Sequence, residues 1–374
     1  MTMTADVAVV GAGIVGAACA LELSRSGVQV VVIDESFIGN GATAAGMGHI
    51  VVMDDSEAQF ALTRYSQMVW DDLEPEAPPN VEFDRCGTIW VAADDEEMIE
   101  VRRKSLYYGQ RGVHTEILDR KGLCSAEPSL RNGLEGGLLV PGDSVLYAPC
   151  AAAFLLDKAR QSRAKVHLGH AVTAIGKGQV TVSDGTSVSA KYVINATGQH
   201  AARLTSGVNI KPRKGHLVIT DRYPNLIRHQ LVELGYLKSA HTVTSDSVAF
   251  NVQPRKTGQI LIGSSRQYDK ASREVDSKIL SQMLQRAFEY VPRLASVSGI
   301  RTWTGFRPAT PDHLPLIGPW PDDPTVILAA GHEGLGITTS LGTGRLVADQ
   351  ILGRKPAIPI EPYLPWRQMS GTHA

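Results

Sequence analysis

The sequence predicts an α/β fold in which a parallel sheet with packed helices is joined to a second, mainly antiparallel α+β domain. A glycine-rich turn between two apolar runs near the start of the chain predicts the parallel sheet. Runs that alternate apolar and polar residues at 216–220, 248–253 and 259–265 predict antiparallel strands, the last two joined as a hairpin. At 374 residues, the chain is long enough for one large domain and a smaller one.

The parallel sheet begins with a β-α-β unit. The segments DVAVV (6–10) and VQVVVID (28–34) are nearly continuous apolar runs, as in strands that are buried on both faces. The segment between them has apolar residues at helical spacing, and Gly27 stands where it can end a helix. This order predicts the first unit of a Rossmann-type sheet.

The turn GAGIVG indicates that the β-α-β unit binds a ligand. Gly11 allows a tight turn, Gly13 allows the backbone to approach a pyrophosphate, and Gly16 allows the helix to pack on the strand. The helix N-terminus then offers N–H groups to phosphates. Asp34, at the end of the second strand, can accept both ribose hydroxyls of an adenosine. The unit predicts a bound dinucleotide but leaves both FAD and NAD open.

Three further segments have features of a ligand site. The loop 35–50 is rich in small residues that let the backbone approach a large ring system, although such a loop is also typical of a flexible connection. The segment 190–201 is predicted as a strand that ends in Ala196, Thr197 and Gly198. The segment 326–353 is predicted as a strand, a glycine turn and a final helix from about Ile337.

Composition excludes several classes of function. The formal net charge is -1, so no excess of basic residues favours nucleic acid or an anionic membrane. No apolar run is long enough to span a membrane, and no signal peptide is recognised, so we expect a cytoplasmic protein. The four cysteines are scattered without a CxxC pair, which argues against a disulfide framework, a metal site or an iron–sulfur cluster in this chain.

These segments, in this order, resemble the D-amino-acid oxidase superfamily of FAD-dependent oxidoreductases. The resemblance runs from Asp6 to about Gly353. The segment AAGM (44–47) is similar to glycine oxidase. AAGMGHIVVMDDS (44–56) is similar to β subunits of D-hydroxyproline and opine dehydrogenases and to a hydrogen cyanide synthase subunit.

The resemblance implies a discontinuous fold of the p-hydroxybenzoate hydroxylase-like type. Its FAD-binding domain is expected at 1–80, 140–208 and 299–374, and its substrate-binding domain at 81–139 and 209–298. Within the second domain we expect an amphipathic helix over 274–291. Its expected buried face carries Val275, Ile279, Leu284, Phe288 and Val291.

The resemblance also implies the reaction. Family members oxidise a C–N bond next to a carboxylate by hydride transfer to flavin N5, and the resulting imine hydrolyses. Arg307, in GFRP, matches the arginine that clamps the substrate carboxylate, against the alternative of an arginine bound to backbone carbonyls. His49 and Tyr236 are further candidates for the catalytic site, and His332 lies in the glycine turn. Each histidine is also compatible with a purely structural role.

The cofactor is expected to be non-covalent FAD. No cysteine lies near Arg307, and no histidine stands at the loop Thr43-Ala44, where related enzymes attach flavin. The residues expected to contact FAD come from the glycine turn, the second strand, the small-residue loop, the strand end near 196 and the last glycine turn. They are Gly11, Gly13, Ile14, Val15, Gly16, Asp34, Glu35, Ala42, Thr43, Ala44, Ala45, Gly46, Met47, Ala196, Thr197, Gly198, Gly331, Gly334, Leu335, Gly336, Ile337 and Thr338.

The functional interpretation has alternatives. The resemblance to dehydrogenase β subunits implies an amino-acid-like small-molecule substrate, a second flavoprotein subunit and an iron–sulfur subunit. A stand-alone oxygen-using oxidase and a non-catalytic electron-relay subunit remain open. A disulfide reductase would need a second GxGxxG turn and a redox cysteine pair, and the sequence has neither.

Overall fold

The computed structural model describes residues 2–235, 246–268 and 272–368. The chain forms two compact units. Unit 1 comprises Met1–Val81, Tyr147–Pro212 and Phe306–Ala374, and unit 2 comprises Glu82–Leu146 and Arg213–Gly305. The chain therefore passes from one unit to the other four times.

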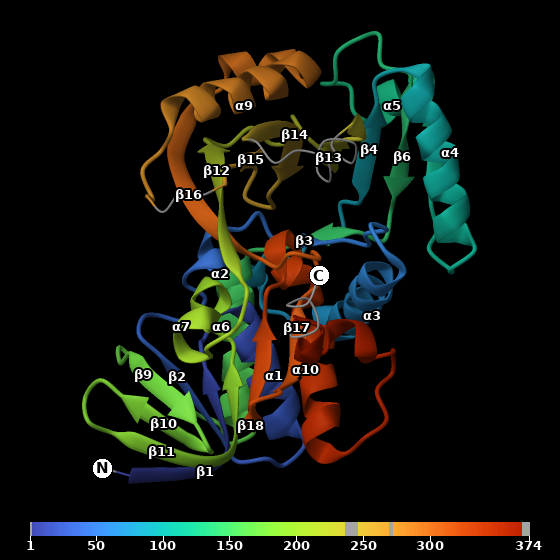
Figure 1. Cartoon of the computed structure of the whole chain (residues 1–374). Coiled ribbons are helices and arrows are strands. Elements are labelled where there is room, and N and C mark those ends of the chain that lie inside the picture. The colour runs from blue at the N-terminus through green and yellow to red at the C-terminus, as the bar shows by residue number, and fades with distance from the viewer. Residues whose placement is uncertain (1, 236–245, 269–271, 369–374) are drawn as a thin grey trace. The chain divides into compact units, whose positions relative to one another are not determined.

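Unit 1 is built on a sheet of order β17-β18-β11-β1-β2-β8 (Figure 1). The strands from β18 to β8 are parallel, and β17 and the hairpin β9–β10 are antiparallel additions. The bounds are β1 Thr2–Val10, β2 Val30–Asp34, β8 Lys165–Leu168, β9 Val172–Gly176, β10 Gln179–Val182, β11 Ser187–Asn195, β17 Leu316–Trp320 and β18 Asp323–Ala330.

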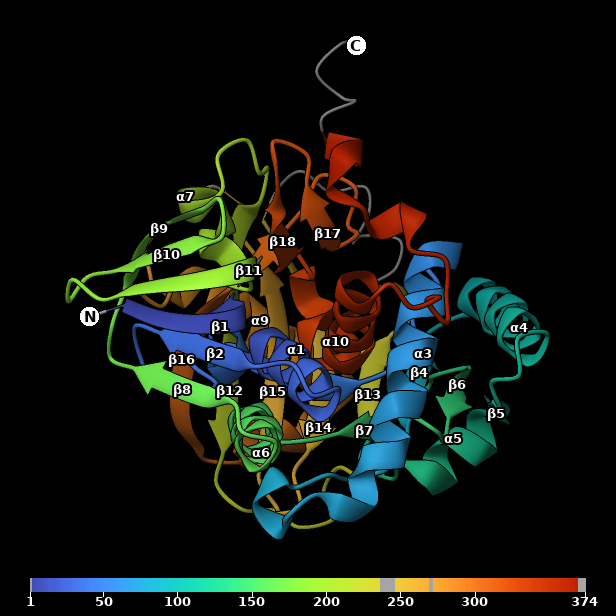
Figure 2. The ribbon, with the colours of Figure 1, turned by 90° about the horizontal axis from the view of Figure 1, so that it is seen from below.

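Helices cover the sheet of unit 1 because the central strands are apolar on both faces. Helix α1 contacts both α6 and α10 and lies between them, and α3 packs on α10 (Figure 2). The bounds are α1 Ile14–Arg25, α2 Ala42–Ala45, α3 Glu57–Leu73, α6 Ala148–Gln161, α7 Ala201–Leu204 and α10 Gly336–Leu352. The small-residue loop predicted over 35–50 thus contains one helical turn, α2, and the short strand β3 (His49–Ile50).

Unit 2 is built on an eight-stranded sheet of order β16-β12-β15-β14-β13-β4-β6-β5. Strand β13 runs parallel to β4, whereas the pairs β12–β15, β14–β15, β13–β14, β4–β6 and β5–β6 are antiparallel. The bounds are β4 Thr88–Ala92, β5 Glu116–Asp119, β6 Gly136–Val140, β12 Lys211–Thr220, β13 Gln230–Glu233, β14 Ser247–Pro254, β15 Ile260–Arg266 and β16 Gly299–Ala309. The predicted hairpin is confirmed as β14 and β15, with Pro254 opposite Ile260.

Among the described residues, unit 2 includes the helices α4 (Asp95–Gly109), α5 (Arg120–Ala126) and α9 (Ser277–Tyr290). Helix α9 packs on β14 and β15. The predicted face of this helix is wrong in part. Asp276 caps the N-terminus, so Val275 precedes the helix and is 38% exposed. The buried stripe is Ile279, Met283, Ala287 and Tyr290, with Leu284 and Phe288 only partly buried beside it.

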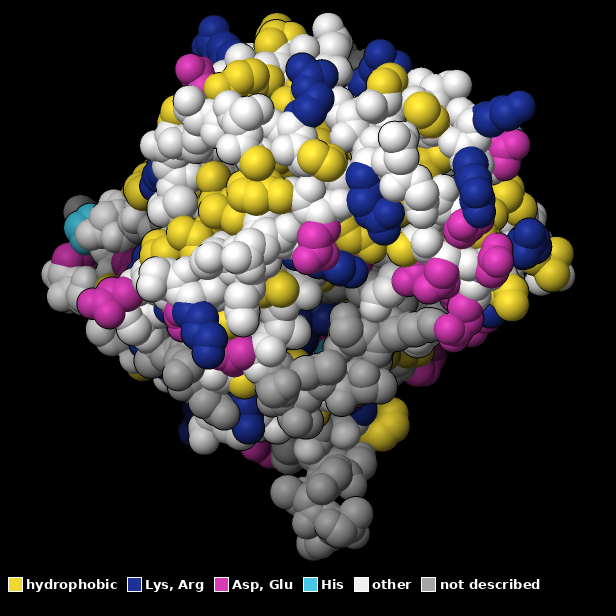
Figure 3. Space-filling view, turned by 90° about the horizontal axis from the view of Figure 1, so that it is seen from above, with side chains coloured by type: hydrophobic (Ala, Val, Ile, Leu, Met, Phe, Trp, Pro, Cys, Tyr) yellow, Lys and Arg dark blue, Asp and Glu magenta, His cyan; other side chains and the backbone are white. Residues whose placement is uncertain are grey.

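The surface agrees with the nearly balanced charge of the sequence. On the face drawn in Figure 3, basic and acidic side chains are interspersed, with hydrophobic side chains between them. The predicted fold class, a Rossmann-type α/β part with a second, mainly antiparallel α+β part, is confirmed.

Candidate functional site

The glycine turn after β1 has the geometry that its residues predict. Gly11 has φ +109°, and a Cβ there would lie 2.6 Å from the carbonyl oxygen of Ala196, so only glycine fits. A Cβ on Gly16 would lie 2.0 Å from the carbonyl oxygen of Gly11. The turn after β1 and the end of β11 are therefore in direct contact, at the carboxyl edge of the parallel sheet.

Asp34, at the end of β2, binds the backbone of this turn through its carboxylate. One carboxylate oxygen accepts the Ala12 N–H at 2.6 Å, and the other accepts the Ser36 N–H at 2.8 Å. Each carboxylate oxygen has a second acceptor position that these bonds do not use. Asp34 thus organises the turn, and it can still accept hydroxyl groups from a ligand. Glu35, next in the chain, is exposed.

Thr43 performs a role that the sequence did not reveal. Its hydroxyl accepts the Ile14 N–H at 3.0 Å and is buried. The hydroxyl therefore acts on α1 as an N-cap side chain does, although it comes from the loop carrying α2. It uses one of the four unpaired N–H groups of the first turn, so the remaining ones are available to a phosphate. The sequence offered no signal, because the two residues are 29 positions apart.

The strand end near 196 is held by a buried asparagine, which is also a residue that the sequence analysis missed. Asn195 donates to the Ala201 carbonyl at 3.0 Å and to the Thr205 hydroxyl at 2.9 Å. Its side-chain oxygen accepts the Thr197 hydroxyl at 2.7 Å. An asparagine at the end of an apolar strand was the available signal, because a buried amide needs partners.

A second turn, 331–336, follows β18 and leads into α10. Its helix begins at Gly336, one residue before the predicted start. Thr338 donates to the His49 carbonyl at 2.8 Å and accepts the Val51 N–H at 3.3 Å. The segment after α2 is therefore fixed to the first turn of α10, and the two predicted cofactor segments are brought together in unit 1.

Arg307 lies at the end of β16 that belongs to unit 1, next to this second turn. A Cβ built on Gly334 would lie 3.7 Å from both Cδ and Nε of Arg307. The side chain is partly buried, and neighbouring Phe306 and Pro308 are buried. The structure thus places a guanidinium beside the glycine turn that precedes α10.

The two candidate histidines, His332 and His49, differ in how deeply they are buried. His332 is 4% exposed, and its Nε2 lies 3.0 Å from the Thr343 hydroxyl. Burial lowers the pKa of His332 to about 3, so its imidazole is neutral near pH 7. His332 therefore fixes the turn to α10 and does not carry charge. His49 is partly buried next to Thr338, while Tyr236 lies outside the described residues.

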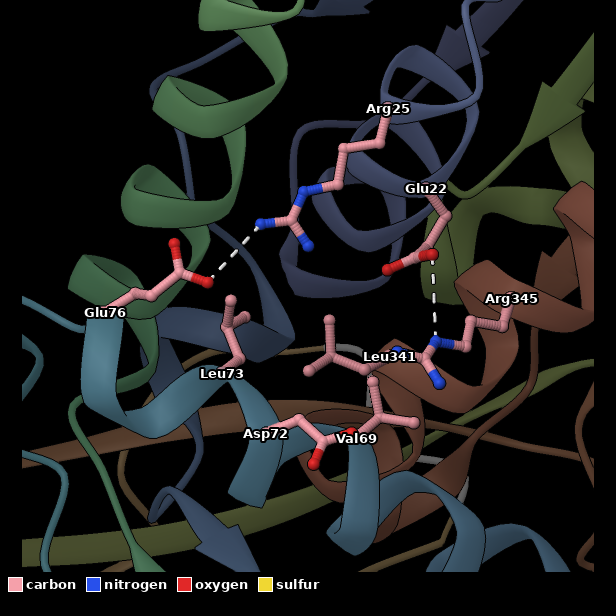
Figure 4. Close-up of a pocket in the computed structure, with 8 residues that line it drawn as sticks. All are labelled: Glu22, Arg25, Val69, Asp72, Leu73, Glu76, Leu341 and Arg345. Carbon is pink, nitrogen blue, oxygen red and sulfur yellow. Dashed lines mark ion pairs between the residues drawn. The ribbon is translucent and has the colours of Figure 1, made fainter.

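A separate hollow of about 170 Å³ lies where α1, α3 and α10 meet on unit 1 (Figure 4). Val69, Leu73 and Leu341 supply apolar side chains, and Glu22–Arg345 and Arg25–Glu76 form ion pairs of 3.8 and 3.9 Å across it. At 1.5 Å per residue, Glu22 lies about 12 Å along α1 from the glycine turn. This hollow is therefore separate from the glycine turn at the start of α1.

The glycine turn, Asp34 and the facing strand end define the class: a dinucleotide-binding α/β protein. The model of the family described as FAD dependent oxidoreductase matches residues 6–350. The chain therefore belongs to the family of FAD-dependent oxidoreductases, and the predicted resemblance and cofactor are confirmed.

Named relatives cover nearly the whole chain. Glycine oxidase of Geobacillus kaustophilus is 28% identical over 378 residues, and the alignment covers 97% of each chain. A crystal structure of glycine oxidase from that organism superposes with a TM-score of 0.86 at 27% identity. This superposition covers 97% of this chain and 98% of that one. A hydrogen cyanide synthase subunit of Pseudomonas aeruginosa is 28% identical over 417 residues, covering 97% of this chain and 96% of the relative. An opine oxidase subunit of Rhizobium meliloti is 26% identical over 370 residues, covering 94% of each chain.

The residues present fit FAD. The backbone at Gly11 and Gly16 is packed too closely for any side chain, and the first turn of α1 faces the same edge of the sheet as Asp34. In the described ranges, no helix combines the length and apolar character that crossing a membrane requires.

Proposed function

We propose that the protein oxidises the C–N bond of an amino acid or an N-substituted amino acid. The candidates are D-amino acids, D-hydroxyproline, opines, and substrates of the glycine or sarcosine type. The observation that carries this proposal is Arg307, a partly buried arginine whose side chain lies beside Gly334 at the turn before α10. A cation held at that turn is suited to bind an anion, and an amino-acid carboxylate supplies one.

FAD would be held by unit 1. Its pyrophosphate would lie on the turn Gly11–Gly16 and its ribose at Asp34, and the first turn of α10 would face the pyrimidine end. When bound, FAD supplies the two-electron acceptor that takes hydride from the substrate carbon. The positive end of α10 would stabilise negative charge there.

The attachment would be non-covalent. Cys19, on α1, is fully buried, and burial raises the pKa of its thiol to about 12, so it is not a reactive thiolate. Cys150, on α6, is the other cysteine of unit 1. Neither stands in the segments that carry Arg307 or the second glycine turn.

Arg307 would align the substrate. A planar guanidinium can donate two parallel hydrogen bonds to one carboxylate, which fixes the orientation of the carbon that loses hydride. No general base is assigned, because an amine that arrives unprotonated needs none. Unit 2, with its large mixed sheet, would supply the substrate-binding domain.

We further propose that the protein is the catalytic subunit of a dehydrogenase complex. The support is its likeness to proteins named as subunits of opine oxidase and of hydrogen cyanide synthase. A second flavoprotein chain and an iron–sulfur chain would then accept the electrons. The likeness to glycine oxidase favours a stand-alone oxidase instead. A purely electron-relaying subunit would not need Arg307.

The substrate class is tested by an anaerobic screen that follows flavin bleaching. The compounds are D-amino acids, D-hydroxyproline, opines, sarcosine and glycine, each compared with its decarboxylated amine. We expect bleaching only by compounds with a carboxylate next to the C–N bond. Equal bleaching by the decarboxylated amines would reject the proposed substrate class.

Arg307 is tested by two substitutions. Arg307→Lys keeps the charge but loses the two-point contact, so KM should rise and kcat should fall. Arg307→Ala should lose about 3–5 kcal/mol in kcat/KM, because the substrate carboxylate would be desolvated and unpaired. FAD content should stay normal in both.

The control is Arg301→Ala, in the same strand. Arg301 is exposed, and its guanidinium lies 5.5 Å from the ring centre of Trp303. This variant should keep wild-type kcat/KM. If Arg307→Ala also does so, the carboxylate is bound elsewhere.

A further inference from the structure

Two residues beside the Arg307 site adopt a backbone conformation that is unfavourable for them. His313 has φ +61° and Glu333 has φ +50°. Both lie in the left-handed region, which glycine adopts freely and side-chain-bearing residues rarely do. Such strain persists where the surrounding structure enforces it, and it is concentrated at functional sites.

The two strained residues are bonded to each other. His313 Nδ1 lies 2.8 Å from a carboxylate oxygen of Glu333. Glu333 is mostly buried, with 13% of its side chain exposed, whereas the His313 side chain is 37% exposed. His313 and Glu333 are thus conformationally strained residues whose side chains join two separate turns. Glycine at both positions would remove the strain and the bond together.

The two turns meet at the open end of the β17–β18 hairpin, opposite the loop that connects the two strands. Leu316 pairs with Ala330, so the turn that precedes β17 and the turn that follows β18 lie at the same end. A Cβ on Gly331 would lie 2.6 Å from the methyl carbon of Thr310, so the turns are also in contact there. The His313–Glu333 bond is a second link between them.

The turn that carries His313 is held in place by several hydrogen bonds. The Thr310 hydroxyl donates to the Leu314 carbonyl at 2.8 Å, and the same carbonyl accepts a guanidinium N–H of Arg367 at 2.6 Å. Arg367 also binds Asp312 at 2.6 Å. The His313 backbone is therefore held on both sides.

The other turn is the one that lies beside Arg307. Glu333 directly precedes Gly334, whose Cβ position lies 3.7 Å from Arg307 Nε. His332, on the other side of Glu333, is bound to Thr343 of α10. The His313–Glu333 bond is thus made by the residue that stands between His332, which is attached to α10, and Gly334, which lies beside Arg307.

We propose that His313 and Glu333 are a pair of positioning residues for carboxylate recognition: their bond fixes the turn that carries Gly334 beside Arg307, and this turn thereby limits the directions open to the guanidinium. The inference rests on the proposed function, because it assigns Arg307 to a substrate carboxylate. Neither side chain needs to touch substrate. Loss of either one breaks the same bond, so both substitutions should have the same effect.

The test is a double-mutant cycle of His313→Gly, Glu333→Gly and the double variant. Each should lower kcat/KM by about ten- to a hundredfold through loss of orientation, and the double variant should be no worse than either single one. Melting temperature should stay within about 2 °C of wild type, because relief of strain offsets the lost bond. The control Lys177→Gly, at another left-handed residue in the β9–β10 turn, should leave kcat/KM unchanged.

A rescue variant separates positioning from general structure. Asparagine tolerates left-handed backbone and keeps a side-chain donor, so His313→Asn should recover part of the kcat/KM lost in His313→Gly. Additive effects in the cycle, or wild-type kcat/KM in the double variant, would overturn the inference. A fall in melting temperature and FAD content parallel to the fall in activity would also overturn it.

A binding measurement keeps this test separate from that of the substrate class. Benzoate serves as a carboxylate probe, and its dissociation constant is read from the change in flavin absorbance. If no amino acid bleaches the flavin, the proposed function fails, but an equal loss of benzoate affinity in the three variants would still support the pair. Equal benzoate affinity in wild type and variants, or no binding to any of them, would overturn the inference.

Discussion

At the scale of single residues, the Asp34 carboxylate orders the glycine turn through the N–H groups of Ala12 and Ser36, and we propose that it also binds the ribose of FAD. Asp34→Ala should weaken FAD binding by about 1.5–3 kcal/mol for each charge-assisted bond that is lost. Asp34→Asn should lose less, because its oxygen can still accept the Ala12 N–H. The measurement is FAD affinity by fluorescence titration of the apoprotein.

Asp6 provides the control for this prediction. It also accepts a backbone N–H, that of Gln29 at 3.1 Å, but lies at the surface near the start of the sheet. Asp6→Ala should therefore leave FAD affinity unchanged. Unchanged affinity in Asp34→Ala as well would remove Asp34 from the ribose position.

His332 makes stability depend on pH. Its pKa is lowered by burial from the ordinary 6.5 to about 3 in the folded protein. Between these values the unfolded chain binds more protons, so the stabilising contribution is complete above pH 6.5 and is lost progressively as the pH falls toward 3. At pH 5, the loss amounts to roughly 2 kcal/mol.

His332→Asn removes this titration. We expect urea unfolding at pH 7.5 and pH 5.0 to show a smaller pH-dependent loss in the variant than in wild type. Other groups titrate in both proteins, so the difference between the two losses isolates the imidazole. Equal losses would show that His332 is charged, or exposed, in the folded protein.

At the scale of elements, α1 and α10 pack closely and both begin at the proposed FAD site. Gly344 makes this approach possible, because a Cβ there would lie 2.7 Å from the carbonyl oxygen of Ala18. Gly344→Ala must push the helices apart and should cost about 1–3 kcal/mol of stability. FAD affinity should fall as well, since the first turn of each helix would move.

Gly109→Ala is the matched control. Gly109 ends α4, and a Cβ there would meet nothing within 4 Å. Alanine favours helix over glycine by up to about 1 kcal/mol, so this variant should be as stable as wild type or more so. Thermal melts of both variants decide the point, and an undiminished melting temperature in Gly344→Ala would show that the helices can separate without cost.

At the scale of the whole molecule, the open question is where the electrons go. We expect a partner subunit or a quinone to accept them more readily than oxygen, because the chain is similar to a protein named as a subunit of opine oxidase. This chain shows no cysteine pattern for an iron–sulfur cluster, so any cluster would come from another chain.

The prediction compares two rates on the isolated chain. With a substrate that bleaches the flavin, reduction of an artificial dye should be much faster than peroxide formation in air. Addition of catalase leaves the dye rate unchanged and serves as the control. Peroxide formation as fast as dye reduction would identify a stand-alone oxidase.

Patterns that are local in the chain were predictable. The β-α-β unit, the hairpin β14–β15 and the start of α10 follow from apolar periodicity and from glycines within short segments. The stripe on α9 was less predictable because it depends on where the helix begins. A capping aspartate at 276 excluded Val275, and small Ala287 lies in the buried stripe against β14 and β15.

The sequence by itself determined the family and the cofactor through its resemblance to a known family. It also determined Gly11 and Gly16 of the first turn, because the closely packed backbone there leaves no room for a side chain. The tertiary structure alone decided which distant groups meet: Thr43 capping α1, Thr338 joining His49 to α10, and His313 bonded to Glu333. These contacts join residues between 20 and 289 positions apart. Hydrogen bonds need their partners within about 3.5 Å, and only the packed fold brings such residues that close.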